Sequence, residues 1–357
     1  MNDNKTSKNS IVAKFAVPIS FLILFFLAAN FTDCDLVTFW KRRNHLTDLV
    51  VDMIPPDFSY IQKILLPLFY TIQMSVTGTV LGTFFALVLS PFGAANLGFP
   101  AVIRRILRIV IQILRSFPAL ILALTATFLF GLGTFAGTFA ITLYTFAIMT
   151  KLTYEDASAA DVKAYQALRA MGVSKYVAYI HGILPEIIPG FLTNALYLLE
   201  TNVRHSSILG YVGAGGIGLL LNEKISWLEY DKVGTILLML FLTVCVIEYF
   251  SRYLAALIRK ERTIKKEQAR LLLLFLAALF LICTFTLSLP DFSRTSPQTL
   301  RNMFAGFLQP DWSFFFSAEK DGLGYLLLET VCIAFIGTVI GAIVSAPLAF
   351  LNTKRFV

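Results

Sequence analysis

The sequence predicts an all-α polytopic membrane protein with about eight transmembrane helices. Of its 357 residues 57% are hydrophobic and only 15% are charged, whereas soluble domains contain about 25% charged residues. A spanning helix needs about 20 mostly apolar residues, because backbone groups in lipid must be hydrogen-bonded internally. Runs of such length without Asp, Glu, Lys or Arg occupy residues 15–32, 64–103, 116–150 and 271–290. This composition excludes soluble, disordered and disulfide-rich proteins.

Three further predicted spans contain ionisable residues. The apolar runs 233–253 and 322–353 contain the acids Glu248 and Glu329. The segment 187–209 is less apolar than the others. It carries Glu200, Asn202, Arg204 and His205.

Two of the long runs need subdivision. Residues 116–150 are too long for one helix and contain the turn sequence GLGT at 131–134, which predicts a hairpin of two spans. Residues 64–103 predict one span that ends near residue 90. The arginines after it recur at helical spacing, which predicts an amphipathic stretch at the membrane interface. They are Arg104, Arg108 and Arg115.

The distribution of Lys and Arg predicts the orientation. If the N-terminus is inside, the inside segments contain 20 of the 30 basic residues, the outside segments contain 9, and Arg204 lies within a span. Basic residues favour the cytoplasmic side, so we expect a cytoplasmic N-terminus and a cytoplasmic 151–189 loop. The net charge of +8 then reflects topology, and we expect no nucleic-acid partner. A cleaved signal peptide is an alternative for the first run, but residues 27–29 are a poor cleavage site.

An internal repeat divides the chain. Residues 71–82 (TIQMSVTGTVLG) match residues 330–341 (TVCIAFIGTVIG) at an offset of 259. The PDF sequence at 56–58 matches PDW at 310–312 at an offset of 254. Transmembrane helices often share Gly-x-x-x-Gly, but two matches in the same order favour duplication. We therefore expect one unit at 1–262 and a partial second copy at 263–357, without a counterpart of the 151–189 loop.

The 151–189 loop is long enough for two short helices around Gly172. Pro185 and Pro189 mark where the chain re-enters the membrane. An ordinary solvated helical hairpin would give the same pattern.

The segment 210–218 contains five glycines. Its GAGGIG sequence fits the dinucleotide fingerprint, but that pattern has meaning only between a strand and a helix. The chain also has no phosphate-binding Gly-Lys-Ser/Thr loop, so we expect no bound nucleotide. The glycines instead predict an irregular backbone, which is tolerated at membrane depth where protein or a water-filled cavity surrounds it.

Glu200 and Arg204 have the i, i+4 spacing of an intrahelical ion pair. They could fix this helix against its neighbours. Alternatively, Arg204 and nearby glycine amides could line a path for an anion, because ionisable groups within spans usually face the bundle interior or an aqueous path. The sequence leaves both interpretations open.

The sequence contains no arrangement typical of a catalytic or metal site. The three histidines lie on different segments, and the four cysteines are far apart and have no metal-ligand spacing. An intramembrane enzyme could use Glu200 and His205 for acid–base chemistry. It would need a second polar set in a facing span, where only Glu248 and Glu329 are available. We therefore expect a protein that is not an enzyme and binds no metal.

The loop resembles that of ABC-importer permeases. Their motif is E-A-A, three residues, Gly, about nine residues and I-x-L-P, and here residues 166–168 (QAL), Gly172 and residues 183–185 (ILP) have this spacing. Gln166 replaces the glutamate, and Gly182 occupies the isoleucine position. The run 197–218 (YLLETNVRHSSILGYVGAGGIG) is similar to one branch, the phosphonate-importer permeases (PhnE type). Residues 131–137 and 55–58 are similar to the same branch.

The resemblance implies an ABC-importer permease fold with a truncated second repeat, in the bacterial cytoplasmic membrane. Such a subunit translocates phosphonate or a related phosphorus oxyanion delivered by an external binding protein. A dimer of cytoplasmic ATPases binds the ATP, so this chain needs no cofactor, and a second permease copy or a homodimer completes the pathway. The alternatives are another cargo (phosphate, phosphite or an amino acid) or a truncated permease that needs a separately encoded remainder.

The resemblance also assigns roles to residues. The implied ATPase-coupling residues are Gln166, Ala167, Gly172, Leu184 and Pro185. The implied residues of the translocation path are Glu200, Asn202, Arg204, Gly213, Gly215, Gly216 and Gly218.

Overall fold

The computed structural model describes residues 20–34, 36–261, 265–288, 301–302, 305–306, 309, 312–317 and 322–351. All regular secondary structure in these residues is helical, which confirms the predicted fold class. Contacts group the chain into two compact units, one of Met1–Asp48 with Asn302–Val357 and one of Leu49–Arg301. These units reflect contacts and do not test the division at residue 262, which stays a prediction from the repeat.

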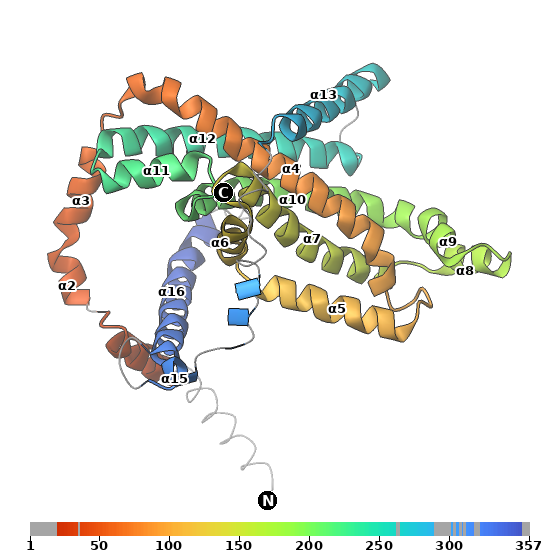
Figure 1. The fold of residues 1–357 in the computed structure, drawn as a ribbon, viewed down its shortest axis with the longest axis horizontal. Helices are drawn as coiled ribbons and strands as arrows, with labels where there is room; N and C mark the ends of the chain where they lie inside the picture. The colour runs from red at the N-terminus through yellow and green to blue at the C-terminus, as the bar shows by residue number, and fades with distance from the viewer. Residues whose placement is uncertain are drawn as a thin grey trace, which may run out of the picture. The chain divides into compact units, whose positions relative to one another are not determined.

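The Leu49–Arg301 unit is built around three long helices, α4, α7 and α10 (Figure 1). The glycines of α4 allow close packing: a Cβ on Gly78 would lie 2.7 Å from Ile141, and one on Gly82 would lie 2.7 Å from the Thr142 carbonyl oxygen. Such small residues let transmembrane helices approach closely. The helices are η1 (Phe58–Tyr60), α4 (Ile61–Gly93), α5 (Ala101–Ser116), α6 (Ala119–Phe130), α7 (Thr134–Ala159), α8 (Lys163–Ala170), α9 (Lys175–Gly182), α10 (Leu184–Leu209), η2 (Gly210–Val212), α11 (Ile217–Ser226), α12 (Tyr230–Ile258) and α13 (Lys266–Phe285).

Five helices of the described chain are long and apolar enough to cross a membrane, and two bent pairs would raise the number to seven. The five are α4 with η1, α7, α12, α13 and α16. The bent pairs are α5 with α6, at 93°, and α9 with α10, at 70°.

The predicted hairpin at 116–150 differs in its first arm. Helix α6 has 12 residues, about 18 Å at 1.5 Å per residue, and is too short to cross a hydrocarbon core of about 30 Å alone. The bend comes at Phe117, which is extended because it precedes Pro118. The predicted amphipathic stretch, α5, therefore forms one bent element with α6.

The Met1–Asp48 and Asn302–Val357 unit contains a helix at Ser20–Phe31, α2 (Leu36–Lys41), most of α3 (Arg43–Asp52), α15 (Trp312–Phe315) and α16 (Leu323–Leu351). The helix Ser20–Phe31 packs against α16 through two ring pairs. Phe21 lies 5.3 Å from Phe335, and Phe31 lies 4.9 Å from Tyr325, between ring centroids. The N-terminal residues 1–19, residues 289–290 of the predicted seventh span, the repeat residues Pro310 and Asp311, and residues 352–357 lie outside the described residues.

Candidate translocation path and coupling loop

Two short helices, α8 and α9, follow α7, as the sequence predicts. Gly172 lies between them with φ +85°, a left-handed conformation that glycine adopts readily. The Lys163 backbone amide donates a hydrogen bond to the Asp161 carboxylate (2.9 Å), and this bond and the Lys163 ammonium keep the pKa of Asp161 below its ordinary value. Ser174 caps α9 by accepting from the Val177 amide (3.4 Å). We call residues 151–189 the coupling loop.

The two helices of the coupling loop pack against each other and against the connection between α4 and α5. A Cβ on Gly182 would lie 2.8 Å from the Tyr165 amide nitrogen, so glycine at this position lets α9 cross close to α8. The Tyr165 hydroxyl donates to the Leu97 carbonyl oxygen (2.6 Å), which joins α8 to the connection between α4 and α5. The coupling loop and the residues around it form a buried hydrophobic cluster, which a freely solvated hairpin would not do. The members of this cluster are Ala94, Leu97, Ala157, Tyr165, Ala178, Tyr179, Ile183 and Ile187.

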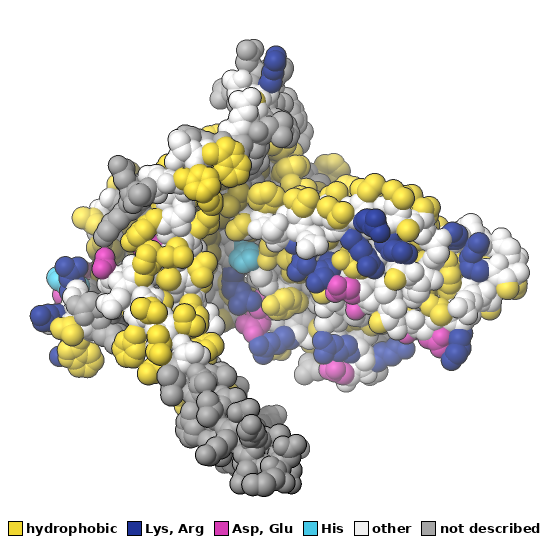
Figure 2. Space-filling view, turned by 90° about the horizontal axis from the view of Figure 1, so that it is seen from below, with side chains coloured by type: hydrophobic (Ala, Val, Ile, Leu, Met, Phe, Trp, Pro, Cys, Tyr) yellow, Lys and Arg dark blue, Asp and Glu magenta, His cyan; other side chains and the backbone are white. Residues whose placement is uncertain are grey.

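The outer face of the coupling loop is exposed and partly apolar. Figure 1 shows α8 and α9 projecting beyond α4, α7 and α10 at one end of the unit. Gln166, Ala167 and Pro185 are exposed and Leu184 is half-buried. Met171, beside Gly172, is 70% exposed. Figure 2 shows Lys and Arg side chains gathered at the end that carries α5, α8 and α9. An exposed apolar surface rimmed by charge is typical of a protein-binding site.

Asn202 lies inside the bundle. Its side chain is fully buried, and its amide donates to the hydroxyls of Thr79 on α4 and Thr145 on α7, both at 2.8 Å. One turn later, the Ser206 and Ser75 hydroxyls lie 2.6 Å apart. Thr79 is near the middle of the 33-residue α4, so these contacts join the three helices near the middle of the span.

The hydroxyls of α4 form a row at every fourth residue, which we call the hydroxyl row: Thr71, Ser75, Thr79 and Thr83. Each donates to the carbonyl oxygen four residues earlier, at 2.6–3.0 Å. Their oxygens can then accept from neighbours, as Thr71 does from the Ile217 amide (2.8 Å). The sequence analysis did not identify these residues. The i, i+4 recurrence of Thr and Ser in an apolar run was the available signal.

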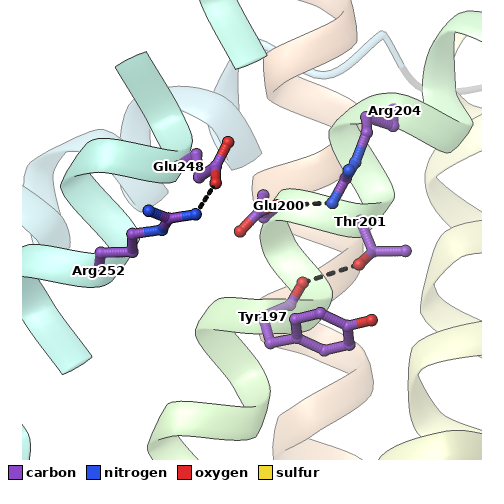
Figure 3. A network of polar contacts seen from close by, with 6 residues as sticks. All are labelled: Tyr197, Glu200, Thr201, Arg204, Glu248 and Arg252. Atoms are coloured by element: carbon purple, nitrogen blue, oxygen red, sulfur yellow. Dashed lines mark hydrogen bonds and ion pairs between the residues drawn. The ribbon is translucent and has the colours of Figure 1, made fainter. Parts of the chain in front are cut away.

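Glu200 and Arg204 lie on another face of α10. Their predicted ion pair is present, with a 2.5 Å separation between Arg204 Nη2 and a Glu200 carboxylate oxygen. The Arg204 side chain is 51% exposed and that of Glu200 is 14% exposed. In Figure 3 the pair stands opposite Glu248 and Arg252, which form the same i, i+4 pair on α12. At 100° per residue Asn202 points away from this face, so the structure separates it from Glu200 and Arg204.

The glycine segment after α10 has the irregular backbone that the sequence predicts. Gly213, Gly215 and Gly216 have φ values of +83°, +80° and +73°. A Cβ on Gly216 would lie 2.7 Å from the Thr71 hydroxyl, and one on Gly218 would lie 1.9 Å from the Ser207 carbonyl oxygen. Protein surrounds the segment, because residues 214–218 are buried.

Replacing Asn202 by leucine is expected to destabilise the protein, because it removes two buried interhelical hydrogen bonds. Such bonds contribute about 0.6 kcal/mol each on average in membrane proteins, with a maximum of about 1.7, so the expected loss is about 1–3 kcal/mol. The thermal midpoint in detergent measures it. Thr201→Ala is the control, since the exposed Thr201 hydroxyl bonds only its own helix, at the Tyr197 carbonyl. Equal thermal midpoints for the two variants would contradict a stabilising role of the Asn202 hydrogen bonds to α4 and α7.

Residues 78–263 match the family model described as the binding-protein-dependent transport system inner membrane component. The chain belongs to this family. Among curated relatives, the phosphite transport system permease protein PtxC of Stutzerimonas stutzeri is 31% identical over 217 residues, which cover 61% of this chain and 79% of the relative. The phosphate-import permease protein PhnE of Mycolicibacterium smegmatis is 31% identical over 57% of this chain and 38% of the relative.

Solved structures support the fold. A chain of an inward-facing MetNI methionine ABC transporter has a TM-score of 0.51 and 21% identity over 57% of this chain and 99% of its own length. This binding-protein-dependent inner membrane component is therefore a multi-pass transport subunit with an ABC-importer permease fold. Among its described residues, no group of three His, Cys, Asp or Glu side chains could hold a metal ion.

Proposed function

We propose that this chain is the permease subunit of an ATP-driven importer for phosphonate or a related phosphorus oxyanion. The observation that carries the proposal is the position of Arg204, a half-exposed cation. It lies two residues beyond Asn202, and the Asn202 side chain contacts the middle of α4. A cation at this depth is costly unless it faces an aqueous path. The relatives named for phosphite, phosphate and phosphonate favour an anionic phosphorus cargo over an amino acid.

In this proposal Glu200 and Arg204 line the path, and Asn202 supports them from the opposite face of α10. Gly213, Gly215, Gly216 and Gly218 allow the close backbone packing that ends α10. An external binding protein delivers the substrate, and ATP binds on partner ATPases. This chain needs no cofactor of its own. A second permease copy completes the path, and the N-terminus is cytoplasmic.

The cargo can be tested by growth. A bacterial host without its own phosphorus-oxyanion importers receives this chain with its cognate ATPase and binding protein. We expect growth on phosphite or a phosphonate as the sole phosphorus source. Rescue of a methionine auxotroph at low methionine, without growth on phosphite or phosphonate, would favour the amino-acid alternative.

Replacing Gly172 by valine is expected to abolish ATPase capture. A β-branched residue at φ +85° is strongly disfavoured. Gly172 also sets the angle between α8, which carries the coupling residues Gln166 and Ala167, and α9, which precedes the coupling residue Pro185. Gly131→Val is a matched control. Gly131 has φ +84°, and a Cβ added to either glycine would have no atom within 4 Å, so both variants place a β-branched side chain at a positive φ without a steric clash.

The measurement is copurification of the cognate ATPase from membranes. We expect the Gly172 variant to lose at least about 90% of the captured ATPase, since a strain of about 1–2 kcal/mol changes an equilibrium about tenfold, and the Gly131 variant to keep it. Equal capture by both variants would mean that the ATPase docks elsewhere.

A further inference from the structure

A pair of polar rings lies next to Arg204, where α7 meets α10. The rings of Tyr144 on α7 and His205 on α10 lie 5.4 Å apart, between centroids, with their planes at 67°. Edge-to-face geometry of this kind is favoured for aromatic rings. Both side chains are half-buried, and Tyr144 packs against the hydrophobic cluster that contains Ile141 and Leu209. This packing holds the polar atoms of both rings in place.

The two ring nitrogens of His205 have different surroundings. Nδ1 is buried and has no hydrogen-bond partner among the described residues. Nε2 is not buried in this way and forms no hydrogen bond within the described chain, so it reaches the accessible surface. A neutral imidazole carries its proton on one nitrogen and accepts on the other. Backbone N–H groups are buried without a partner more rarely than carbonyl groups, and the same preference assigns the His205 proton to Nε2.

Two further donor groups accompany this N–H. Within the described chain the Tyr144 hydroxyl forms no hydrogen bond, and it is not one of the buried atoms without a partner. The Arg204 guanidinium donates through Nη2 to the Glu200 carboxylate. Because a guanidinium has five N–H donors, others remain available. Neighbouring residues of α7 and α10 thus carry three kinds of donor that can still bind an acceptor.

The position of His205 on α10 places its donor at the edge of the candidate path. At 100° per residue, His205 points between the direction of Arg204 and that of the buried Asn202. It therefore borders the face that carries Glu200 and Arg204. Ionisable side chains within a span usually face the bundle interior or an aqueous path, and the accessible Nε2 favours the path.

We propose that His205 and Tyr144 complete an oxyanion subsite with Arg204. The inference rests on the proposed function, because it places the transported phosphorus oxyanion at Arg204. Phosphite and phosphonates have three oxygens on one phosphorus atom, whereas a carboxylate has two. The guanidinium neutralises the charge, and the His205 N–H and the Tyr144 O–H each donate to one oxygen. These two neutral donors make the subsite selective for a phosphorus oxyanion over the carboxylate of an amino acid.

Uptake into proteoliposomes that contain the permease and its cognate ATPase and binding protein separates donation from ring packing. We expect Tyr144→Phe and His205→Leu each to lower phosphite uptake about three- to tenfold, as the loss of one neutral hydrogen bond would. His205→Gln keeps an N–H donor near the position of Nε2, and its uptake should stay within about twofold of wild type. Tyr249→Phe is the control, because Tyr249 is 75% exposed on α12. Full uptake by Tyr144→Phe, which retains both rings, would show that the rings only pack.

Protection of His205 from acylation tests the subsite without transport. Diethyl pyrocarbonate acylates accessible neutral histidines, and mass spectrometry measures its reaction at His205 and at the exposed His181, the internal control. In the purified complex of permease and ATPase, without binding protein, we expect excess phosphite to slow acylation of His205 at least about threefold and to leave His181 unaffected. Equal rates with and without phosphite would overturn the subsite, and so would protection by methionine alone.

Failure of the subsite and failure of the proposed path give different results. If Arg204→Gln abolishes uptake while His205 is neither protected by phosphite nor sensitive to substitution, the subsite is refuted and the path role of Arg204 is retained. If phosphite protects His205 while Arg204→Gln leaves uptake intact, the path role of Arg204 is refuted and the donor role of His205 is retained.

Discussion

Replacing Gly218 by alanine is expected to destabilise the folded bundle strongly. The added Cβ would lie 1.9 Å from the Ser207 carbonyl oxygen and 2.9 Å from the Gly210 Cα. Both are backbone atoms, so no side-chain rotation relieves the clash and the end of α10 must move. Overpacking typically costs about 1–3 kcal/mol and sometimes more, and we expect the upper end of that range.

The measurement is the amount of monodisperse protein on size-exclusion chromatography in detergent. We expect Gly218→Ala to lower it by at least about tenfold, corresponding to about 1.4 kcal/mol. Gly190→Ala is the control, because Gly190 lies inside α10 with no atom within 4 Å of an added Cβ. There alanine has the better helix propensity and should not destabilise. If the Gly218→Ala protein were as abundant as the Gly190→Ala protein, the close approach of Gly218 to the Ser207 backbone would be contradicted.

Replacing Arg204 by glutamine is expected to lower phosphite or phosphonate uptake by about 10- to 100-fold. A hydrogen bond to a charged group contributes about 1.5–3 kcal/mol, and that contribution would be lost for an anion in the path. Arg252→Gln is the matched control on α12, where the same i, i+4 pair with Glu248 exists. We expect uptake by the Arg252 variant to stay within about twofold of wild type.

A reversed pair, Glu200→Arg with Arg204→Glu, separates the two interpretations of this ion pair. It keeps an attractive pair on α10 but moves the cation by one helical turn. If the pair only fixes α10 against its neighbours, uptake survives the reversal. If Arg204 contacts the anion, uptake falls while the yield of folded protein stays near wild type. Full uptake by the reversed pair would refute the path role.

Glycine position made much of this architecture predictable. Gly172 and the 210–218 segment imply particular backbone geometries, and the structure has left-handed φ values at Gly172, Gly213, Gly215 and Gly216. The i, i+4 spacing of Glu200 and Arg204 likewise predicts their ion pair without knowledge of any neighbour.

Features that depend on a partner helix were not predictable. The burial of Asn202 follows from the positions of Thr79 and Thr145, which lie 123 and 57 residues away. Local sequence places Asn202 two residues from Arg204 but does not say which face of α10 meets α4. The bend between α5 and α6 was also missed, although it had a local signal in Pro118, which disfavours a helical conformation at Phe117.

The hydroxyl row of α4 has a consequence for motion. Thr71, Ser75, Thr79 and Thr83 already donate their hydrogens within their own helix. If α10 rolls away from α4, these side chains lose only acceptor contacts and leave no hydroxyl donor stranded in the membrane. Leaving a buried donor unpaired costs about 1–3 kcal/mol, and the row avoids that cost at each position. Opening the interface between α4 and α10 would therefore leave no hydroxyl donor of this row unpaired, and its hydrogen-bonding cost would fall on the Asn202 amide, which would lose Thr79 as an acceptor.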